Sequence, residues 1–293
     1  MKTRHIGGTE VSAIGLGGMP MSIEGRPDEQ RSITTIHAAL DAGVSFIDTA
    51  DAYHLHADEV GHNETLIARA LATYGGDTSA VLVATKGGHL RPGDGSWTLS
   101  GSPDYLKRAA EASLKRLGVD ALGLYQFHRP DPAVPYADSV GALRDLLDAG
   151  KIKMAGISNA NSDQIREAYE ILGGRLASVQ NQFSPAFRSS EPELELCDQM
   201  GIAFLPWSPL GGISAAGHLG HAYAAFDQVA TARGVSPQRV CLAWLLAKSE
   251  HLIPIPGASR PETIQDSARA VDLELTSVEI DQLDAPTRAT RQV

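Results

Sequence analysis

The stretch HAALDAGVSFIDTA, residues 37–50, joins the end of a helix-like pattern to the start of a strand-like one. The pattern of residues 28–42 predicts a helix, and Gly43 stands where such a helix should end. The run VSFIDTA (44–50) is apolar and contains Val, Ile and Phe, which favour a buried strand. The stretch therefore predicts one helix–strand unit of an α/β fold.

The same alternation runs along the chain. Strand patterns occupy residues 11–19, 44–50, 80–87, 121–129, 153–159, 177–183, 202–208 and 252–257. Helical patterns occupy residues 28–42, 58–74, 103–117, 136–149, 162–172, 190–200, 221–233 and 236–249. Strands that alternate with helices need right-handed crossovers and a parallel sheet, and this number of units in 293 residues fits a closed (β/α)8 TIM barrel.

The competing fold is an open, doubly wound nucleotide-binding sheet. That fold usually carries G-x-G-x-x-G between its first strand and first helix. The stretch GLGGMP (15–20) does not match this motif, and Pro20 leads into a loop instead of a helix. We therefore expect one barrel domain over residues 1–293. It should begin with a short β-hairpin, TRHIGGTEV, which turns at Gly7–Gly8 and is placed to plug the barrel floor.

Composition and charge disfavour several kinds of partner. With 43% hydrophobic residues the chain can bury a sizeable core, while its longest apolar run, VCLAWLLA (240–247), is far too short to cross a bilayer. The N-terminus lacks the apolar region of a secretory signal, and Cys197 and Cys241 stand in no metal-ligand or redox spacing, which fits a reduced, cytoplasmic setting. The net charge of −10 disfavours nucleic acid and anionic membranes as partners.

Three neighbouring strand patterns each end in an ionisable side chain. Asp48 ends SFID, Lys86 ends LVATK and His128 ends LYQFH, and Tyr53 lies just beyond Asp48. Taken singly, these four have ordinary structural explanations: a helix cap, a solvated lysine, a rim histidine or a core aromatic. Because the carboxyl ends of barrel strands converge on one face, the four together predict an active site. Asp51, in the same stretch, fits a helix cap.

The chemistry of this predicted site follows from charge. A buried lysine needs a counter-ion, which Asp48 can supply to Lys86. A lysine cation lowers the pKa of a nearby phenol, which makes Tyr53 a usable general acid, and His128 can hydrogen-bond the same substrate oxygen. These groups suit a carbonyl oxygen that gains negative charge. Since they supply neither electrons nor a nucleophile, a cofactor is expected.

Seven short strings are spread over nearly the whole chain: FIDTADAY with GHNETLIARAL after it, VATKGG, LYQFHRPD, GISN, VQNQFSP, PWSPLGG and IPGASR. In order and spacing they resemble the aldo-keto reductase superfamily. The resemblance implies a catalytic tetrad of Tyr53, Lys86, Asp48 and His128. It also implies that NADPH binds across the barrel mouth, without a separate nucleotide-binding module, and that hydride passes to a small aldehyde or ketone.

The resemblance further implies which residues hold the nicotinamide. Ser158 and Asn159 of GISN would bind its carboxamide, with Gln180 as their partner. Trp207 would stack on the ring, where a flat indole fixes which face meets the substrate. These contacts would place the nicotinamide beside the tetrad.

The phosphates are expected near the last two strand patterns, where barrels commonly bind them. SPLGG (208–212) would lie along the pyrophosphate, and GASRPET (257–263) would start a helix at the 2′-phosphate. Arg260 matches a position that favours NADPH over NADH by charge. The cofactor contacts predicted in this part of the chain are Ser208, Leu210, Gly211, Gly257, Ser259, Arg260, Asp266 and Ser267. Asp266–Ser267 departs from the Glu–Asn pair that the family often carries near the adenine.

The loop HLRPGDGSWTLSG (89–101) is expected to form one wall of an open mouth. Few residues follow the expected helix 276–284, so a long covering loop after it is not expected. Trp97 is the predicted apolar contact to the substrate. Small aldehydes, a pyridoxal-type aldehyde, sugar carbonyls and ketone intermediates all fit this site, and the oligomeric state is left open.

Two rival functions and one rival ligand share these residues. Lys86 at a strand end could be the covalent nucleophile of a class I aldolase. The chain could also be a low-turnover regulatory subunit that keeps the cofactor site. His54, His56 and His62 of HLHADEVGH could ligate zinc or nickel, but loop histidines beside a helix start need no metal, and hydride transfer uses none. We therefore expect no metal site.

Overall fold

The computed structural model describes residues 1–285, and a curled sheet of parallel strands lies at its centre. The strands follow one another in the order β11-β10-β9-β8-β5-β4-β3. Their bounds are β3 (Leu16–Gly17), β4 (Phe46–Asp48), β5 (Leu82–Gly87), β8 (Leu122–Phe127), β9 (Ile152–Ser158), β10 (Leu176–Gln180) and β11 (Ala203–Phe204). Each neighbouring pair is parallel, as the alternation of strands with helices predicts.

The sheet closes into a barrel through a segment that is not a regular strand. The prediction of a regular strand at residues 252–257 is wrong in detail. This segment forms only isolated parallel bridges, to β11 on one side and to β3 on the other. Pro254 and Pro256 have no N–H to donate to a ladder. Their carbonyl groups still accept hydrogen bonds from the N–H groups of Gly15 and Gly17, both at 2.9 Å. The (β/α)8 barrel is therefore confirmed, with an irregular eighth stave.

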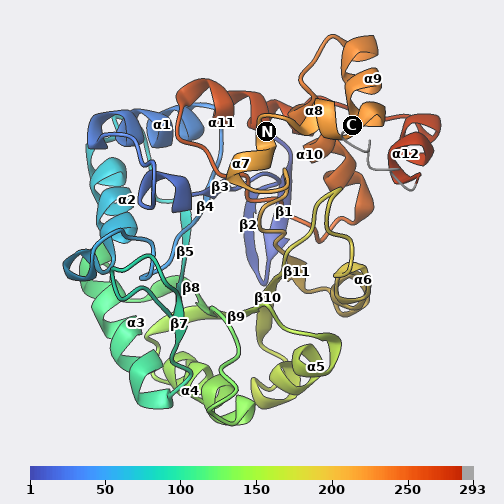
Figure 1. Cartoon of the computed structure of the whole chain (residues 1–293). Coiled ribbons are helices and arrows are strands. Elements are labelled where there is room, and N and C mark those ends of the chain that lie inside the picture. The colour runs from blue at the N-terminus through green and yellow to red at the C-terminus, as the bar shows by residue number, and fades with distance from the viewer. Residues whose placement is uncertain (286–293) are drawn as a thin grey trace.

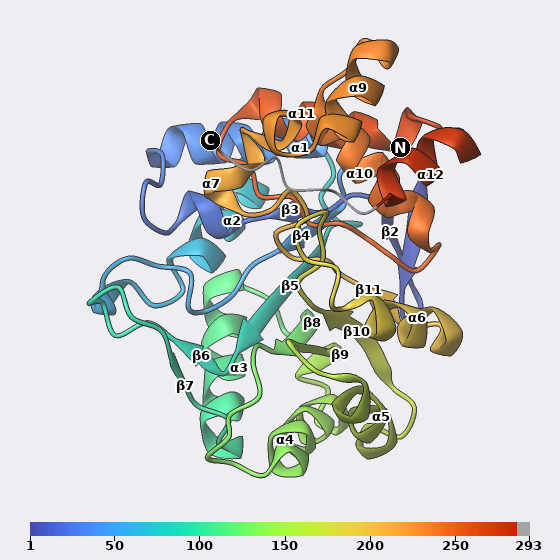
Figure 2. The ribbon, with the colours of Figure 1, turned by 45° about the vertical axis from the view of Figure 1, so that its right-hand side comes forward.

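Helices surround the sheet, as Figure 1 shows and Figure 2 repeats from a second direction. The outer ring consists of α1 (Glu29–Asp41), α2 (His62–Thr73), α3 (Pro103–Leu117), α4 (Tyr136–Asp148), α5 (Ser162–Ile171), α6 (Glu191–Met200), α10 (Pro237–Lys248) and α11 (Pro261–Ala268). The further helices are α7 (Ile213–Ala216), α8 (Leu219–Ala222), α9 (Ala224–Arg233), α12 (Ser277–Asp284) and the 3-10 turns η1 (Met19–Met21), η2 (Ala57–Glu59) and η3 (Arg269–Asp272). The helix expected over 221–233 is thus divided between α8 and α9.

Local sequence explains where most helices begin and end. The Ser102 and Ser236 side chains cap α3 and α10 by accepting a backbone N–H two residues into the helix, and a proline follows each serine. Gly118 and Gly201 end α3 and α6 with φ of 68° and 67°. The helix expected over 58–74 begins later, because Gly61 interrupts it with a φ of 79°.

The N-terminal hairpin closes the barrel floor. Strands β1 (Thr3–Ile6) and β2 (Thr9–Ser12) pair antiparallel, and Gly7 in the turn has a φ of 54°. Ile6 and Val11 are buried in one cluster with interior side chains of the barrel such as Phe46 and Leu124. The predicted hairpin is therefore confirmed, and its apolar face fills the floor.

A second, smaller hairpin stands on the opposite rim. The loop after β5 forms β6 (His89–Leu90) and β7 (Thr98–Leu99), which pair antiparallel, although the sequence predicted only a loop here. This hairpin brings residues 89–99 close to the end of β8, where the predicted site lies. Among residues 1–285 no helix is both long and apolar enough to span a membrane.

Candidate active site

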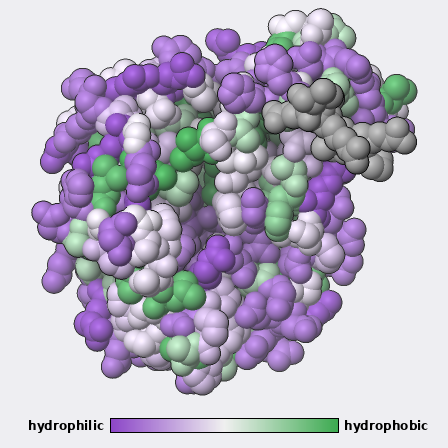
Figure 3. Space-filling view, in the orientation of Figure 1, coloured by the Kyte–Doolittle hydropathy of each residue, from purple (hydrophilic) through white to green (hydrophobic). Residues whose placement is uncertain are grey.

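A cavity of about 1350 Å³ opens at the carboxyl ends of the barrel strands. In the space-filling view it appears as the hollow near the centre of the face, between hydrophilic and hydrophobic side chains (Figure 3). The strand ends, the β6–β7 hairpin, the segment before α7 and the start of α11 all contribute lining residues. The cavity therefore lies where barrel folds concentrate their chemistry.

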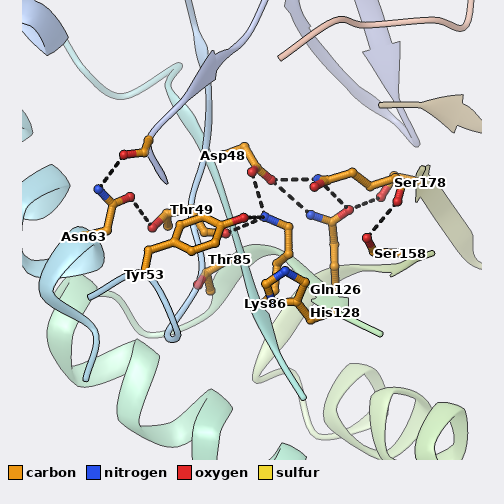
Figure 4. Close-up of polar contacts among 12 residues, drawn as sticks. Asp48, Thr49, Tyr53, Asn63, Thr85, Lys86, Gln126, His128, Ser158 and Ser178 are labelled. Carbon is orange, nitrogen blue, oxygen red and sulfur yellow. Dashed lines mark hydrogen bonds and ion pairs between the residues drawn. The ribbon is translucent and has the colours of Figure 1, made fainter. Parts of the chain in front are cut away.

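Lys86 connects the groups at the bottom of this cavity (Figure 4). Its ammonium nitrogen Nζ lies 2.7 Å from Asp48 Oδ2, 3.1 Å from the Tyr53 hydroxyl and 2.9 Å from the backbone carbonyl of Thr49. The lysine is fully buried, so these partners replace the water that an ammonium group normally needs. The structure thus joins Asp48, Lys86 and Tyr53 in one hydrogen-bonded cluster.

Asp48 is held by amide donors as well as by the lysine. Gln180 Nε2 donates to Asp48 Oδ1 at 2.8 Å, and Gln126 Nε2 donates to the same oxygen at 3.3 Å. Gln126 was not predicted from the sequence. It could have been found from its position two residues before His128 in LYQFH, because residues two apart in a strand point to the same side of the sheet. These donors fix the carboxylate towards Lys86.

Burial and charge act in opposite directions on the pKa of the cluster. Burial raises the pKa of Tyr53, and the neighbouring Lys86 cation only partly opposes this shift. The lysine thus acts on the phenol in the predicted direction, although burial outweighs it. For Lys86 burial lowers the pKa, but Asp48 and Tyr53 outweigh it and the net shift is upward. Near neutral pH the phenol keeps its proton and the ammonium group its charge.

His128 adds a neutral imidazole to the cluster. Its ring lies edge-on to the Tyr53 ring, with the centroids 5.8 Å apart, and both line the cavity. Burial, with the nearby Lys86 cation, lowers the pKa of His128 well below its usual value. Its Nδ1 atom is buried and has no hydrogen-bond partner within residues 1–285. The ring can therefore bind an incoming oxygen without adding a charge.

The residues predicted for the nicotinamide lie next to this cluster. Ser158 Oγ donates to the backbone carbonyl of Gln180 at 2.7 Å, and Asn159 Nδ2 donates to the backbone carbonyl of His128 at 3.0 Å. The Gln180 side chain turns instead to Asp48, so its link to Ser158 runs through the main chain. Asn159 has a φ of 58°, a strained value that is common at functional sites.

The segment after β11 forms the next part of the cavity wall. Trp207 lines the cavity, and its buried indole N–H has no hydrogen-bond partner in the part of the chain that the structure describes. Ser208, with a φ of 49°, and Leu210 also line it. Gly211 has a φ of 88° but stands just outside the lining, where its neighbour Gly212 takes part instead. This irregular backbone leaves open space between the barrel mouth and α7.

The predicted phosphate residues lie at the far end of the cavity. Gly257, Ser259 and Arg260 line it where α11 begins. Asp266 and Ser267 line it one turn later, within α11. The Asp266 carboxylate already pairs with the Arg239 guanidinium and accepts a hydrogen bond from Ser236. Arg260 is exposed at the helix start.

A family model described as the aldo/keto reductase family matches residues 13–287. The chain belongs to the aldo/keto reductase family. An uncharacterised oxidoreductase of Schizosaccharomyces pombe is 34% identical, over 96% of this chain and 89% of the relative. A 6-dehydroglucose reductase of Novosphingobium aromaticivorans is 35% identical, over 90% and 88%. A solved aldo/keto reductase of Klebsiella pneumoniae, in complex with NADP and acetate, is 28% identical, covers 97% of this chain and 94% of its own, and has a TM-score of 0.80.

In this aldo/keto reductase the β6–β7 hairpin forms the outer wall of the cavity. Trp97 lies between His89 and Arg91, with 4.6 Å between the Trp97 and His89 rings and 4.8 Å between the guanidinium carbon and the indole. Trp97 lines the cavity and is 38% exposed, so part of the indole is free to contact a ligand. The sequence predicted Trp97 but missed His89 and Arg129, which line the same part of the cavity. Apart from its position after the end of a strand, neither residue had a sequence feature that pointed to the site.

The histidines near η2 have other partners. His54 Nδ1 bonds the carbonyl of His56 at 2.7 Å, and His62 Nδ1 bonds Ser22 Oγ at 2.9 Å. Over residues 1–285 no three His, Cys, Asp or Glu side chains are grouped so that they could hold a metal ion. Asp51, predicted to cap a helix, is instead buried and accepts a hydrogen bond from the Tyr105 hydroxyl at 2.9 Å. That prediction was wrong.

Proposed function

We propose that this aldo/keto reductase transfers hydride from NADPH to the carbonyl carbon of an aldehyde or ketone, with Tyr53 as the general acid. The reverse reaction would oxidise the corresponding alcohol. The observation that carries the proposal is the contact of 3.1 Å between Lys86 Nζ and the Tyr53 hydroxyl, at the bottom of an open cavity. A phenol next to a fixed cation can give up a proton, because the phenolate that forms is stabilised at once.

Each member of the tetrad has a distinct task in this proposal. Tyr53 donates its proton to the carbonyl oxygen, while His128 binds the same oxygen through its neutral ring. Lys86 stays protonated and stabilises the Tyr53 phenolate. Asp48 keeps the lysine in place and charged, which explains why its other oxygen is held by amide donors. NADPH, when bound, supplies the hydride.

The residues around the cavity fit a nicotinamide cofactor. The buried N–H of Trp207 lacks a partner among residues 1–285, and Asn159 lines the cavity with a backbone φ of 58°. At the other end Ser259 and Arg260 precede α11, whose positive dipole end suits a phosphate. Arg260 would favour NADPH over NADH through its charge. The NADP complex of the Klebsiella relative supports this assignment.

The contacts of Lys86 argue against a Schiff-base enzyme. A class I aldolase needs an unprotonated amine with a free path to its substrate. Here the ammonium group is fully buried, engages three oxygen partners and has a raised pKa. Borohydride treatment in the presence of a carbonyl substrate should therefore leave no adduct on Lys86.

The test of the proposed function is Tyr53→Phe. The variant should lose carbonyl reduction by at least about a hundredfold, because it removes the proton donor. NADPH affinity should stay close to that of the wild type, because the phenol hydroxyl lies among the tetrad and not among the predicted cofactor contacts. Loss of absorbance at 340 nm with a panel of aldehydes reads turnover, and cofactor fluorescence reads binding.

Tyr74→Phe is the matched control, because it removes a phenol hydroxyl that bonds Asp41 on the protein surface. It should leave turnover unchanged. If Tyr53→Phe keeps wild-type turnover, the phenol is not the acid. If the wild type binds NADPH but reduces no carbonyl compound, the chain acts as a low-turnover binding subunit instead.

A further inference from the structure

The substrate side of the cavity contains an arginine that the tetrad chemistry does not use. Arg129 directly follows His128 and lines the cavity. Its one hydrogen-bond partner in the described chain is Asn159 Oδ1, at 3.1 Å, and its Nε is buried without any partner. Within residues 1–285 no carboxylate lies at ion-pairing distance from its guanidinium. A half-buried cation is costly when its donors are unused.

The neighbouring charges do not neutralise this cation. Glu24, which also lines the cavity, pairs with Arg91, and Asp48 pairs with Lys86. Both of these cavity-lining acids therefore already have their own base. The net positive charge that is left belongs to Arg129, although the chain as a whole carries −10.

His89 adds a second polar group beside Arg129. Its ring lies 4.9 Å from the His128 ring, edge-on, and packs on Trp97 from the other side. Burial, with the nearby Arg129 cation, lowers the pKa of His89 to about 4. The ring is thus neutral near pH 7 and offers one N–H donor. Arg129 and His89 together present hydrogen-bond donors and a positive charge next to the oxygen-binding His128.

We propose that Arg129 and His89 form an anion subsite that binds a carboxylate on the carbonyl substrate. The inference deepens the proposed reductase function and depends on it. The guanidinium fork fits a planar carboxylate with two parallel hydrogen bonds. The exposed part of the Trp97 indole, which lines the cavity, can contact an apolar spacer between the carboxylate and the carbonyl group. The preferred substrates are therefore oxo-acids, in which an aldehyde or ketone carries a carboxylate.

Matched pairs of acid and ester test this subsite. We would measure kcat and KM with 4-carboxybenzaldehyde against methyl 4-formylbenzoate, and with succinic semialdehyde against methyl 4-oxobutanoate. The wild type should favour at least one acid by about ten- to a hundredfold in kcat/KM, mainly through KM. Arg129→Gln should abolish that acid-to-ester ratio, and Arg129→Lys should keep part of it because the charge remains.

Controls separate this subsite from other roles of Arg129. Arg144→Gln removes one positive charge from an exposed site on α4 and should leave the ratio unchanged. If Arg129 only positions Asn159 for the cofactor, Arg129→Gln lowers NADPH affinity and slows acid and ester alike, which would overturn the inference. Equal wild-type kcat/KM for acid and ester would overturn it too.

These experiments also distinguish a failure of the anion subsite from a failure of the proposed reductase function. Activity with the esters alone would keep that function and reject the subsite. If the wild type reduces neither acid nor ester, quenching of tryptophan fluorescence by the same compounds still measures the acid-to-ester preference in binding. A preference that Arg129→Gln removes would then support the subsite, and no preference would reject it.

Discussion

Replacing Asp51 with asparagine should make the protein more stable above neutral pH. Asp51 is 2% exposed, and among residues 1–285 only one of its carboxyl oxygens has a side-chain hydrogen-bond partner, the Tyr105 hydroxyl. Burial, reinforced by the negative charge of Glu64, raises the pKa of Asp51 to about 7 against opposition from Tyr105 and Arg116. Asparagine has the size of the protonated acid and cannot ionise. The variant therefore reproduces the low-pH state at every pH.

The magnitude follows from proton linkage. In the unfolded chain this carboxyl group ionises near its ordinary pKa of 3.8, whereas in the folded chain it stays protonated up to about 7. The folded state holds the extra proton, so the stability that this proton supplies is lost as the pH rises through 7. The loss is about 1.4 kcal/mol for each pH unit between the two pKa values, or about 3 kcal/mol between pH 5 and pH 8.

The assay is urea unfolding of wild type and Asp51→Asn at a series of pH values. The difference in free energy of unfolding between the two proteins should shift by about 3 kcal/mol in favour of the variant from pH 5 to pH 8. Other titrating groups cancel in this difference. Asp163→Asn, at an exposed position in the first turn of α5, should show no comparable change. A difference that stays constant over this pH range would refute the reasoning.

Three further substitutions test other parts of the structure. Lys86→Met should abolish reduction and cost about 3 to 5 kcal/mol in the free energy of unfolding, because it leaves the Asp48 carboxylate buried without its cation; unchanged thermal unfolding would contradict this. Arg260→Ala should weaken NADPH binding at least about tenfold more than NADH binding in fluorescence titrations, because only NADPH carries the 2′-phosphate; equal losses would show that Arg260 does not bind this phosphate. Gly87→Ala should lower the stability by about 1 to 3 kcal/mol in urea unfolding, because a Cβ atom there would meet the Tyr125 hydroxyl at 2.1 Å; wild-type stability would mean that this tyrosine moves freely.

Local patterns were sufficient to predict which side chains meet at the barrel mouth. Asp48, Lys86 and His128 each end an apolar run, and a parallel barrel must bring such strand ends to one rim. Tyr53 was included because it follows Asp48 closely enough to fold back over the same mouth, and the resemblance to the family gave it the same role. Gln126 was not predicted, because a glutamine within an apolar run indicates a site residue only when it is known which side chains of the strand face the barrel interior.

Contacts between distant segments could not be predicted in the same way. The helix-cap interpretation of Asp51 used nearby sequence alone, while its actual partner, Tyr105, lies on α3. The stave at 252–257 failed as a regular strand because its prolines break the ladder, although its position between β11 and β3 follows from barrel closure. The anion subsite proposed at Arg129 depends on the absence of an acidic partner in the described chain. A short sequence pattern does not show whether an arginine has such a partner.

The N-terminal hairpin also bears on how a proton would reach Tyr53 in the proposed reaction. Its apolar side chains, Ile6 and Val11, are buried in an apolar cluster with interior side chains of the barrel, at the end opposite the cavity. We therefore expect a proton that Tyr53 donates to be replaced through the cavity mouth. Substrate, product and protons would then all pass through the cavity mouth. A product that dissociates slowly would delay both the binding of the next substrate and the reprotonation of Tyr53.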